Sequence, residues 1–552
     1  MDQKLIRWVT PAPVDAEARR RLRKTLEDIQ LENRRAPEPG DLMPFATLRK
    51  LHFASITLFD EGPHQNDPVL VFESNIDRFD PKFDGQSMDY VKALVASCRR
   101  GLDAIYGGSA DYPGKGATNK AVEDWLKRLK RVVQLHHEGH PHLSLEAIEG
   151  DYELRRSIAE ALKDPAIHNA SPTAIIERLR DRVPKKPWWV PASVLHSRRP
   201  KETQNDRRDD PLRLEDFEWI RDRRSWLRAH FILVFATLGW VMGFCLTWVL
   251  PVIGITRPYA LGVVFALAFV LMYQASVHAK IIKAAGIAAA VIFFVYLPFR
   301  YLLPANPAPP WWITAVLAAL LIPGIFLLAS SVKVATTLPL TRTFDRLSAA
   351  ERDRFRALLE AEDRPENGSY NHVAGLSVLK CHHRRLRWWR SYLTLRLLNL
   401  FYRSLYIRGR LLSIPSIHFA QWSLIDDHRL LFVTNYDGQA DSYLDDFFTA
   451  LATGVAFIWI DTEEFPGTID PRHLKIWVRR GQTLAGVRYR APIYNGLTVG
   501  AINSNAEIRM RFLSGWRDST ARRWLSRFGV AVEEPTLTAQ LWTRIKSMTS
   551  EV

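Results

Sequence analysis

The chain has 552 residues and a formal net charge of +16, from 75 Lys and Arg against 59 Asp and Glu. This length exceeds that of one ordinary domain, and the three cysteines, without paired spacing, exclude a disulfide framework and a cysteine-based zinc site. Much of the positive charge flanks apolar segments, so we assign it to contact with anionic lipid headgroups and expect no nucleic-acid partner.

The first part of the chain predicts a helical arm and an α+β unit. Residues 1–44 form the arm, with a charged helix over 16–33. Residues 45–170 form a first α+β repeat, and a proline-rich charged linker follows over 171–225. Within the repeat we expect strands at 51–59, 69–73 and 102–106, helices at 86–100 and 119–133, and a third helix near its end.

Four apolar segments lie within residues 226–334 and occupy 229–250, 259–277, 281–303 and 311–332. Each is long enough to cross a hydrocarbon core, which takes about 20 residues of helix. Basic residues gather at both ends of this region and at its middle turn, so the positive-inside rule places both termini and both repeats in the cytoplasm. The sequence therefore predicts a bacterial inner-membrane protein with four spans. Buried helices of a soluble core are the alternative.

The last part of the chain predicts surface helices and a second α+β unit. Residues 335–410 are expected to form amphipathic helices at the membrane surface, because leucine and tryptophan recur every three or four residues among arginines after residue 384. Packing of this helix on the neighbouring repeat is the alternative. Residues 411–530 form the second repeat and 531–552 a tail. Within this repeat we expect helices at 442–453, 471–484 and 506–513 and a strand at 455–460.

The two α+β units repeat one another in sequence. LHFA at 51–54 returns as IHFA at 417–420, and VLVFESNID at 69–77 returns as RLLFVTNYD at 429–437. Half-units of this kind expose a sheet face that must be covered, and pairing the two sheets would cover both. The expected fold class is α+β, with two duplicated ferredoxin-like domains that form a pseudo-dimeric α/β barrel, interrupted by the four-helix transmembrane segment.

The repeated polar residues are the first candidates for a site. His52 and His418 occupy equivalent places, and each is a candidate haem ligand or general base; the alternative is a strand histidine that bonds neighbouring backbone. The candidate cofactor-binding residues end the following strand, where their alternative role is to close a turn. They are Asn75, Asp77 and Asn435, and Asp437 at the same strand end is a candidate catalytic residue.

A histidine-rich stretch provides weak candidates for metal binding. It contains His136, His137, His140 and His142. The spacing is one residue short of the helical motif of zinc proteases, and Pro141 favours a loop. We therefore expect a solvated loop here and no dedicated metal site.

Three motifs in the second repeat resemble a group of bacterial membrane proteins that carry HFA and NYDG patterns and often accompany dye-decolorizing-type haem peroxidases. The motifs are IPSIHFA at 414–420, LFVTNYDG at 431–438 and YLDDF at 443–447. Those peroxidases have a duplicated barrel and a Gly-x-x-Asp-Gly motif whose aspartate assists peroxide cleavage. The resemblance implies haem as a candidate cofactor and Asp437 as that aspartate, although Thr434 replaces the first glycine.

These observations lead to two expectations for function. The first is a cytosolic binding or accessory domain presented at the membrane leaflet, with the phospholipid membrane and a peroxidase-type protein as partners. The second is a membrane-tethered haem peroxidase or related oxidoreductase, with His52, His418 and Asp437 in its pocket. A transporter is disfavoured because the apolar segments contain almost no charge within the membrane.

Overall fold

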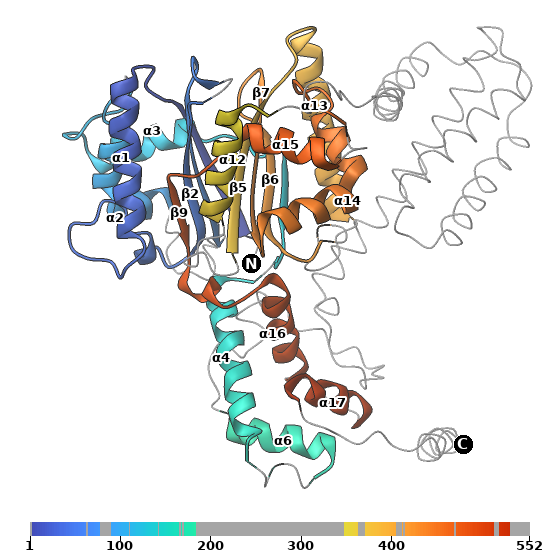
Figure 1. Ribbon diagram of the computed structural model, residues 1–552. Coiled ribbons are helices and arrows are strands. Elements are labelled where there is room, and N and C mark those ends of the chain that lie inside the picture. The colour runs from blue at the N-terminus through green and yellow to red at the C-terminus, as the bar shows by residue number, and fades with distance from the viewer. Residues whose placement is uncertain are drawn as a thin grey trace, which may run out of the picture.

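The computed structural model describes a body built from two antiparallel sheets and the helices that cover them (Figure 1). The residues that it describes are 3–61, 64–77, 90–109, 111–141, 143–164, 167, 170–183, 347–362, 370–404, 411, 414–467, 471–512 and 518–529.

The first sheet has the strand order β1-β3-β2-β9, and the second has the order β4-β6-β7-β5-β8. The strands are β1 (Gln3–Pro11), β2 (Leu51–Phe59), β3 (Val69–Asp77), β4 (Leu135–Glu138), β5 (Tyr370–Val378), β6 (Ile417–Leu424), β7 (Arg429–Asp437), β8 (Gln482–Thr483) and β9 (Val487–Arg490). Every pairing of these strands is antiparallel.

The helices complete two copies of the same order of elements. The first copy contains α1 (Ala16–Glu32), α2 (Tyr90–Tyr106), α3 (Asn119–Leu129), α4 (Leu145–Ala161) and α6 (Pro172–Arg182). The second contains α13 (Arg384–Ser404), α14 (Ala440–Trp459), α15 (Pro471–Gly481), α16 (Val499–Phe512) and α17 (Asp518–Leu525), and α12 (Ala349–Glu362) precedes it. Short 3-10 helices cover Phe45–Thr47, Pro492–Asn495 and Ser526–Phe528.

Each repeat gives one strand to the sheet of the other. Strand β4 comes from the first repeat but pairs with β6, and β9 comes from the second repeat but pairs with β2. The registers correspond, since Phe53 lies opposite Arg490 and its counterpart Phe419 lies opposite Glu138. The two repeats therefore form one body through a reciprocal exchange of strands.

The sheets face each other through an apolar layer. Its residues are Val9, Phe59, Val69 and Val71 from the first sheet and its hairpin, and Ala374, Leu376, Ile425, Leu431 and Val433 from the second. All nine residues of β2 and all eight of β6 are buried. Both faces of these strands are covered, one by the opposite sheet and the other by helices, which explains their nearly continuous apolar sequence.

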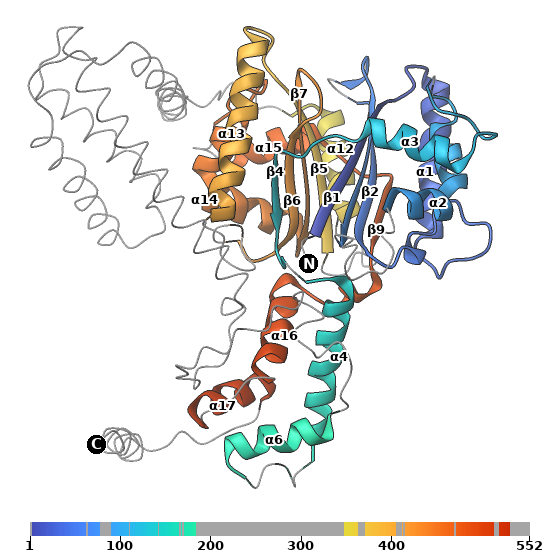
Figure 2. The same ribbon diagram turned by 180° about the vertical axis from the view of Figure 1, so that it is seen from behind.

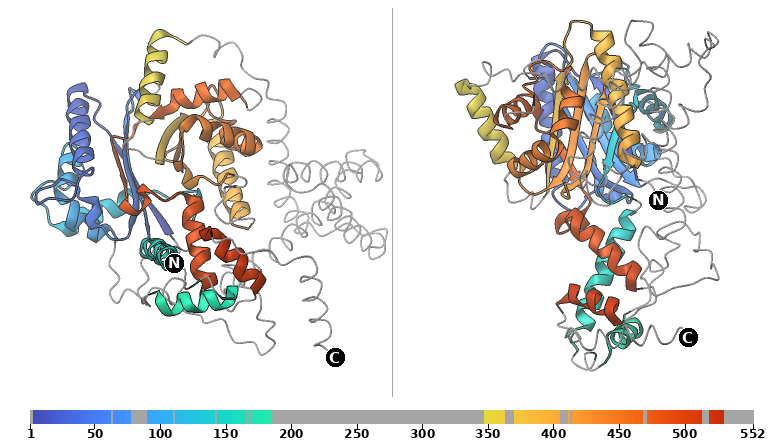
Figure 3. Two further views of the ribbon diagram at one scale, coloured as in Figure 1. Left: turned by 60° about the horizontal axis from the view of Figure 1, so that its bottom comes forward. Right: turned by 90° about the vertical axis from the view of Figure 1, so that its right-hand side faces the viewer.

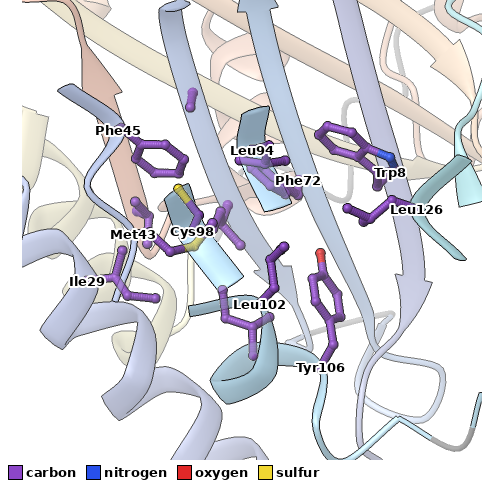
Figure 4. Packing of buried hydrophobic residues seen from close by; sticks show 14 of the residues in the cluster. Trp8, Ile29, Met43, Phe45, Phe72, Leu94, Cys98, Leu102, Tyr106 and Leu126 are labelled. Atoms are coloured by element: carbon purple, nitrogen blue, oxygen red, sulfur yellow. The ribbon is translucent and has the colours of Figure 1, made fainter. Parts of the chain in front are cut away.

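Helices cover the outer faces of the two sheets. Figure 1 shows α1, α2 and α3 beside the first sheet, and Figure 2 shows α13 on the outer side of the second, near β4 and β6. Figure 4 shows the core between the first sheet and its helices, where Trp8 and Phe72 of the sheet pack near Leu102 and Tyr106 of α2. The centroids of the Trp8 and Phe72 rings are 4.9 Å apart.

A second layer of helices extends beyond one end of the sheets. Figure 3 shows α4, α6, α16 and α17 gathered there, two from each repeat. They share an apolar core that includes Ile158, Ile176 and Trp524. Arg509 of α16 also forms a fully buried ion pair with Asp151 of α4. The extension is thus a second place where the two repeats are joined.

Each repeat begins one strand and one helix earlier than the sequence indicated. Strand β1 and helix α1 lie in the predicted N-terminal arm, and β5 and α13 lie in the predicted membrane-surface segment. All four belong to the repeats, because β1 pairs with β3 and β5 pairs with β7 over nine residues each. Helix α13 packs on its own repeat, which is the alternative left open above.

The predicted strands at 102–106 and 455–460 are wrong. Helix α2 continues to Tyr106 and α14 to Trp459. Gly101, the residue after the predicted helix 86–100, lies inside α2 and allows close packing there. A Cβ at this position would lie 2.1 Å from the Met43 side chain and 2.7 Å from the Leu42 carbonyl oxygen. Apolar sequence at the end of a buried helix was thus mistaken for a short strand.

None of the helices in the described part of the chain is both long and apolar enough to cross a membrane. The longest, α13, has 21 residues but carries arginine along its length. The fold class is therefore corrected to an α+β body of two antiparallel sheets whose described part lacks the predicted four-helix membrane segment, and the four-span inner-membrane location is not retained. The apolar segments within 226–334 lie outside the described residues.

The exchanged strand β4 provides a test of this architecture at Gly139, whose N–H donates to the His418 carbonyl oxygen at 2.7 Å. A Cβ at this position would lie 2.1 Å from the Ile417 carbonyl oxygen. Backbone must move to relieve that overlap, so we expect Gly139→Ala to lower the free energy of unfolding by about 2 kcal/mol or more. Urea denaturation measures the change.

Gly116→Ala is the matched control, because a Cβ there meets no atom within 4 Å. Its effect is expected to stay within about 0.5 kcal/mol, as for other surface substitutions. Equal effects of the two substitutions would contradict the close approach of the backbone after β4 to β6.

Candidate functional site

The repeated histidines lie at equivalent irregularities of the two sheets. In the pairing of β2 with β3 the register shifts between Leu51 and Phe53, and in the pairing of β6 with β7 it shifts between Ile417 and Phe419. Bulges of this kind change the direction of a side chain. The duplicated sequence thus places His52 and His418 at the same kind of position, and both are almost completely buried.

Each histidine is bonded to the aspartate that ends the neighbouring strand. His52 Nε2 lies 2.8 Å from Asp77 Oδ1, and His418 Nε2 lies 2.8 Å from Asp437 Oδ1. A carboxylate accepts, so both histidines donate their Nε2–H groups and present Nδ1 as a hydrogen-bond acceptor. The structure therefore brings together the histidine and aspartate candidates within each repeat.

The second carboxylate oxygen of each aspartate receives a hydrogen bond from the start of a helix. The Leu145 N–H of α4 donates to Asp77 Oδ2 at 3.1 Å, and the Val499 N–H of α16 donates to Asp437 Oδ2 at 2.8 Å. Helix N-termini stabilise negative charge. The same arrangement in both repeats fixes the orientation of each carboxylate toward the histidine.

Two further side chains join the histidines between the repeats. The hydroxyl group of Tyr494 donates to His52 Nδ1 at 2.5 Å. His140 Nε2 lies 3.4 Å from His418 Nδ1 and 3.5 Å from the Tyr494 hydroxyl oxygen. Each of these residues comes from the repeat opposite to the histidine that it contacts. The strand exchange thus assembles one buried centre, which we call the His–Tyr centre: His52, His140, His418 and Tyr494.

Burial shifts the pKa of two members of this centre and of two other histidines in the body. It lowers the pKa of His140 well below the usual value, helped by the neighbouring His418 and His52, and it raises the pKa of Tyr494 well above the usual value. His140 is therefore neutral at pH 7. Burial also lowers the pKa of His137 to about 3 and that of His372 on β5 to about 3.

The remaining candidates lie outside the centre. Asn435 accepts a hydrogen bond from the Tyr370 hydroxyl group, whereas Asn75 Oδ1 has no hydrogen-bond partner in the described part of the chain. Of the histidine-rich stretch, His136 lies 3.3 Å from Glu138, and His137 Nε2 lies 3.3 Å from the Ile417 carbonyl oxygen.

The stretch is not the solvated loop that the sequence indicated. Its first residues form β4, and of its three described histidines only His140 reaches the centre. His142 lies outside the described residues.

The described residues do not fit haem at this position. Both ring nitrogens of His52 make hydrogen bonds, so iron coordination would have to break one of them. The space around the histidines is filled by aromatic rings, with the centroid of Phe53 4.5 Å from that of Tyr494 and 5.3 Å from that of Phe419. A porphyrin would have to displace this packing.

Comparisons of the chain with protein-family models, with curated proteins and with solved structures found no match. The assignment of a function therefore depends on the geometry of this chain.

Tyr494 is the member of the centre that the sequence analysis missed. It lies five residues before the first residue of α16, as His140 lies five residues before the first residue of α4. Extending the repeat to these two helices would have paired the two positions. The difference in residue type, tyrosine against histidine, concealed the match.

A cluster of possible metal ligands at the β6–β7 turn has a structural role. Its members are Asp426, Asp427 and His428. Asp426 Oδ1 accepts hydrogen bonds from the His428 and Arg429 N–H groups at 2.9 and 2.8 Å, which closes the turn. The cluster is explained by that turn.

Helix α13 carries a second candidate site, an exposed apolar surface. Leu386, Trp389 and Leu393 are 63%, 57% and 41% exposed and lie three and four residues apart, on one face of the helix. Arg385 and Arg396 are exposed beside them. We call this set the α13 surface.

The buried neutral histidines predict a loss of stability in acid. A histidine with a folded-state pKa near 3 and an unfolded-state pKa near 6.5 takes up a proton on unfolding, so its effect is absent above pH 6.5 and grows as pH falls toward 3. Each such residue lowers the free energy of unfolding by about 1.4 kcal/mol per pH unit in that window. We expect His372→Leu to reduce the slope by about one proton in denaturation curves between pH 6.5 and 5.

His382→Leu is the control, because His382 is exposed. It should leave the slope unchanged. A His372→Leu protein with the slope of the parent protein would show that His372 takes up no proton on unfolding.

Proposed function

We propose that the protein is a binding or accessory module and that the α13 surface docks a protein partner. The observation that carries this proposal is the contrast between α13 and its counterpart α1. The first half of α1 exposes Arg20, Arg21 and Lys24, which pair with acidic residues of the same helix. The equivalent helix of the second repeat exposes leucine and tryptophan instead.

The α13 surface has the composition of a protein-binding hot spot. Tryptophan, tyrosine and arginine are the residues most enriched at such positions. Trp389 packs edge-on against Trp388 and Tyr392, with ring centroids 5.1 and 5.8 Å apart. Trp388 is fixed in turn, since its indole N–H donates to the Asp426 carbonyl oxygen at 2.8 Å. The exposed ring is therefore held in place before a partner arrives, which lowers the entropy cost of binding.

The inner face of α13 anchors the surface to the second repeat. Arg387 binds Asp461 at 2.9 Å, Arg390 also binds Asp461, and Leu395 is fully buried. These contacts fix the position of α13 on the second repeat. Leu386, Trp389 and Leu393 remain exposed on the outer face of this helix, and a contiguous exposed apolar surface of this kind marks an interaction site.

The charge around the surface favours an acidic partner. Arg385 and Arg396 are exposed beside the apolar residues, and the Arg396 guanidinium lies 5.4 Å from the centroid of the Tyr392 ring. Apolar residues at helical spacing with basic neighbours complement an amphipathic helix whose polar face is acidic. We infer that the partner presents such a helix. The sequence resemblance described above suggests a peroxidase-type protein as its source.

A synthetic peptide tests the proposal. We expect a labelled amphipathic helix of alternating leucine and glutamate clusters to bind the full chain, measured by fluorescence anisotropy. Trp389→Ala should weaken binding by about 30-fold, the effect of losing about 2 kcal/mol at a hot spot. Arg21→Ala on the exposed face of α1 should leave binding unchanged.

A second peptide, with lysine in place of glutamate, tests the charge. It should bind at least about 10-fold more weakly than the acidic peptide, because its lysine side chains would be repelled by Arg385 and Arg396. Equal binding of the two peptides, or unchanged binding by the Trp389→Ala protein, would rule out this docking surface.

A further inference from the structure

The His–Tyr centre brings together potential metal-ligand atoms from both repeats. His52 and His418 both use their Nε2–H groups for aspartate, so each has a lone pair on Nδ1. The single hydroxyl hydrogen of Tyr494 is directed to His52 Nδ1. His418 Nδ1 faces another ring nitrogen, His140 Nε2, at 3.4 Å.

Two distances from His140 Nε2 match the spacing of ligand atoms around a metal ion. His140 Nε2 lies 3.4 Å from His418 Nδ1 and 3.5 Å from the Tyr494 hydroxyl oxygen. Ligand atoms about 2.0–2.1 Å from a tetrahedral zinc ion lie about 3.3 Å from one another. The three ring centroids are 5.3, 5.5 and 5.7 Å apart, so the rings surround a common point.

We propose that this centre binds one zinc ion through His140 Nε2, His418 Nδ1 and the Tyr494 oxygen. Asp437 acts as a positioning residue, because its bond to His418 Nε2–H directs the Nδ1 lone pair toward the metal, as carboxylates commonly do behind zinc-bound histidines. His52 has a different task, since it bonds the ligand Tyr494.

Zinc binding includes the transfer of one proton. The Tyr494 O–H bond breaks, a bond forms between that hydrogen and His52 Nδ1, and the oxygen of the resulting phenolate binds zinc. The 2.5 Å contact between the two atoms provides the path. The resulting His52 imidazolium is paired with Asp77. Zinc therefore overcomes the high pKa that burial gives to Tyr494.

The charges of the centre balance after this transfer. The zinc ion brings two positive charges, which the Tyr494 phenolate and the Asp437 carboxylate offset. The His52 imidazolium and the Asp77 carboxylate offset one another. A buried site that is neutral overall avoids the large cost of burying net charge. The second repeat has Tyr494 where the first repeat has His140, and this difference supplies the one anionic ligand.

The test uses the full chain after treatment with a chelator and dialysis. Titration with Zn²⁺ should give one bound ion per chain and a near-ultraviolet difference spectrum of one tyrosinate at neutral pH. Titration with Co²⁺ should give visible bands of a low-symmetry, four- or five-coordinate ion. Tyr494→Phe removes only a hydroxyl group, and we expect it to abolish the tyrosinate signal and weaken metal binding at least about 10-fold.

Three other variants separate this site from the rest of the molecule. His418→Gln should abolish binding, and Asp437→Asn should weaken it by about 10- to 100-fold. His428→Gln changes the Asp426, Asp427 and His428 cluster and should leave binding and spectra unchanged. Circular dichroism confirms that each variant is folded, and Tyr494→Phe remains informative if His418→Gln is not.

Several results would overturn the proposal. One is a folded protein that takes up no stoichiometric Zn²⁺ or Co²⁺, which would leave a plain N–H···N hydrogen bond between His140 and His418. A second is metal uptake without a tyrosinate signal. A third is uptake that Tyr494→Phe leaves intact and His428→Gln removes, which would place an adventitious ion at the β6–β7 turn.

Discussion

The reciprocal exchange of β4 and β9 is the constraint on which the rest of the structure depends. Each strand completes the sheet of the opposite repeat. The helix that follows it, α4 or α16, donates its first N–H group to the aspartate of its own repeat. Neither sheet is therefore complete within one repeat, whereas each His–Asp pair forms within its own repeat. Because of the exchange, the two sheets, the helices that follow the exchanged strands and the buried polar centre form one body.

Duplication explains both the symmetry of the centre and its one departure from symmetry. The His–Asp pairs and the helix N–H bonds are equivalent, with both His–Asp distances at 2.8 Å. The residues that meet between them differ, since one repeat gives His140 and the other gives Tyr494. In a symmetric pair two like groups would face each other. Divergence at this position gave one donor, one acceptor and a ligand set of mixed charge.

The outer faces of the equivalent helices α1 and α13 differ between the two repeats. Helices α1 and α13 occupy equivalent places, but α1 is covered with ion pairs and α13 with exposed leucine and tryptophan. Interior positions are held by packing against the opposite sheet, whereas outward positions of a helix can change at little cost to stability. A duplicated protein can thus acquire a docking surface on one repeat without disturbing its core.

The sequence by itself determined the duplication, the α+β class of the repeats and the equivalence of His52 and His418, because repeated local patterns survive in the order of residues. Only the tertiary structure decided which sheet β4 and β9 join, where α13 packs and which residues contact His52 and His418. Strand partners such as Phe53 and Arg490, which are 437 residues apart, leave no local periodicity. Tyr494 was missed for the same reason: its role depends on a contact 442 residues away.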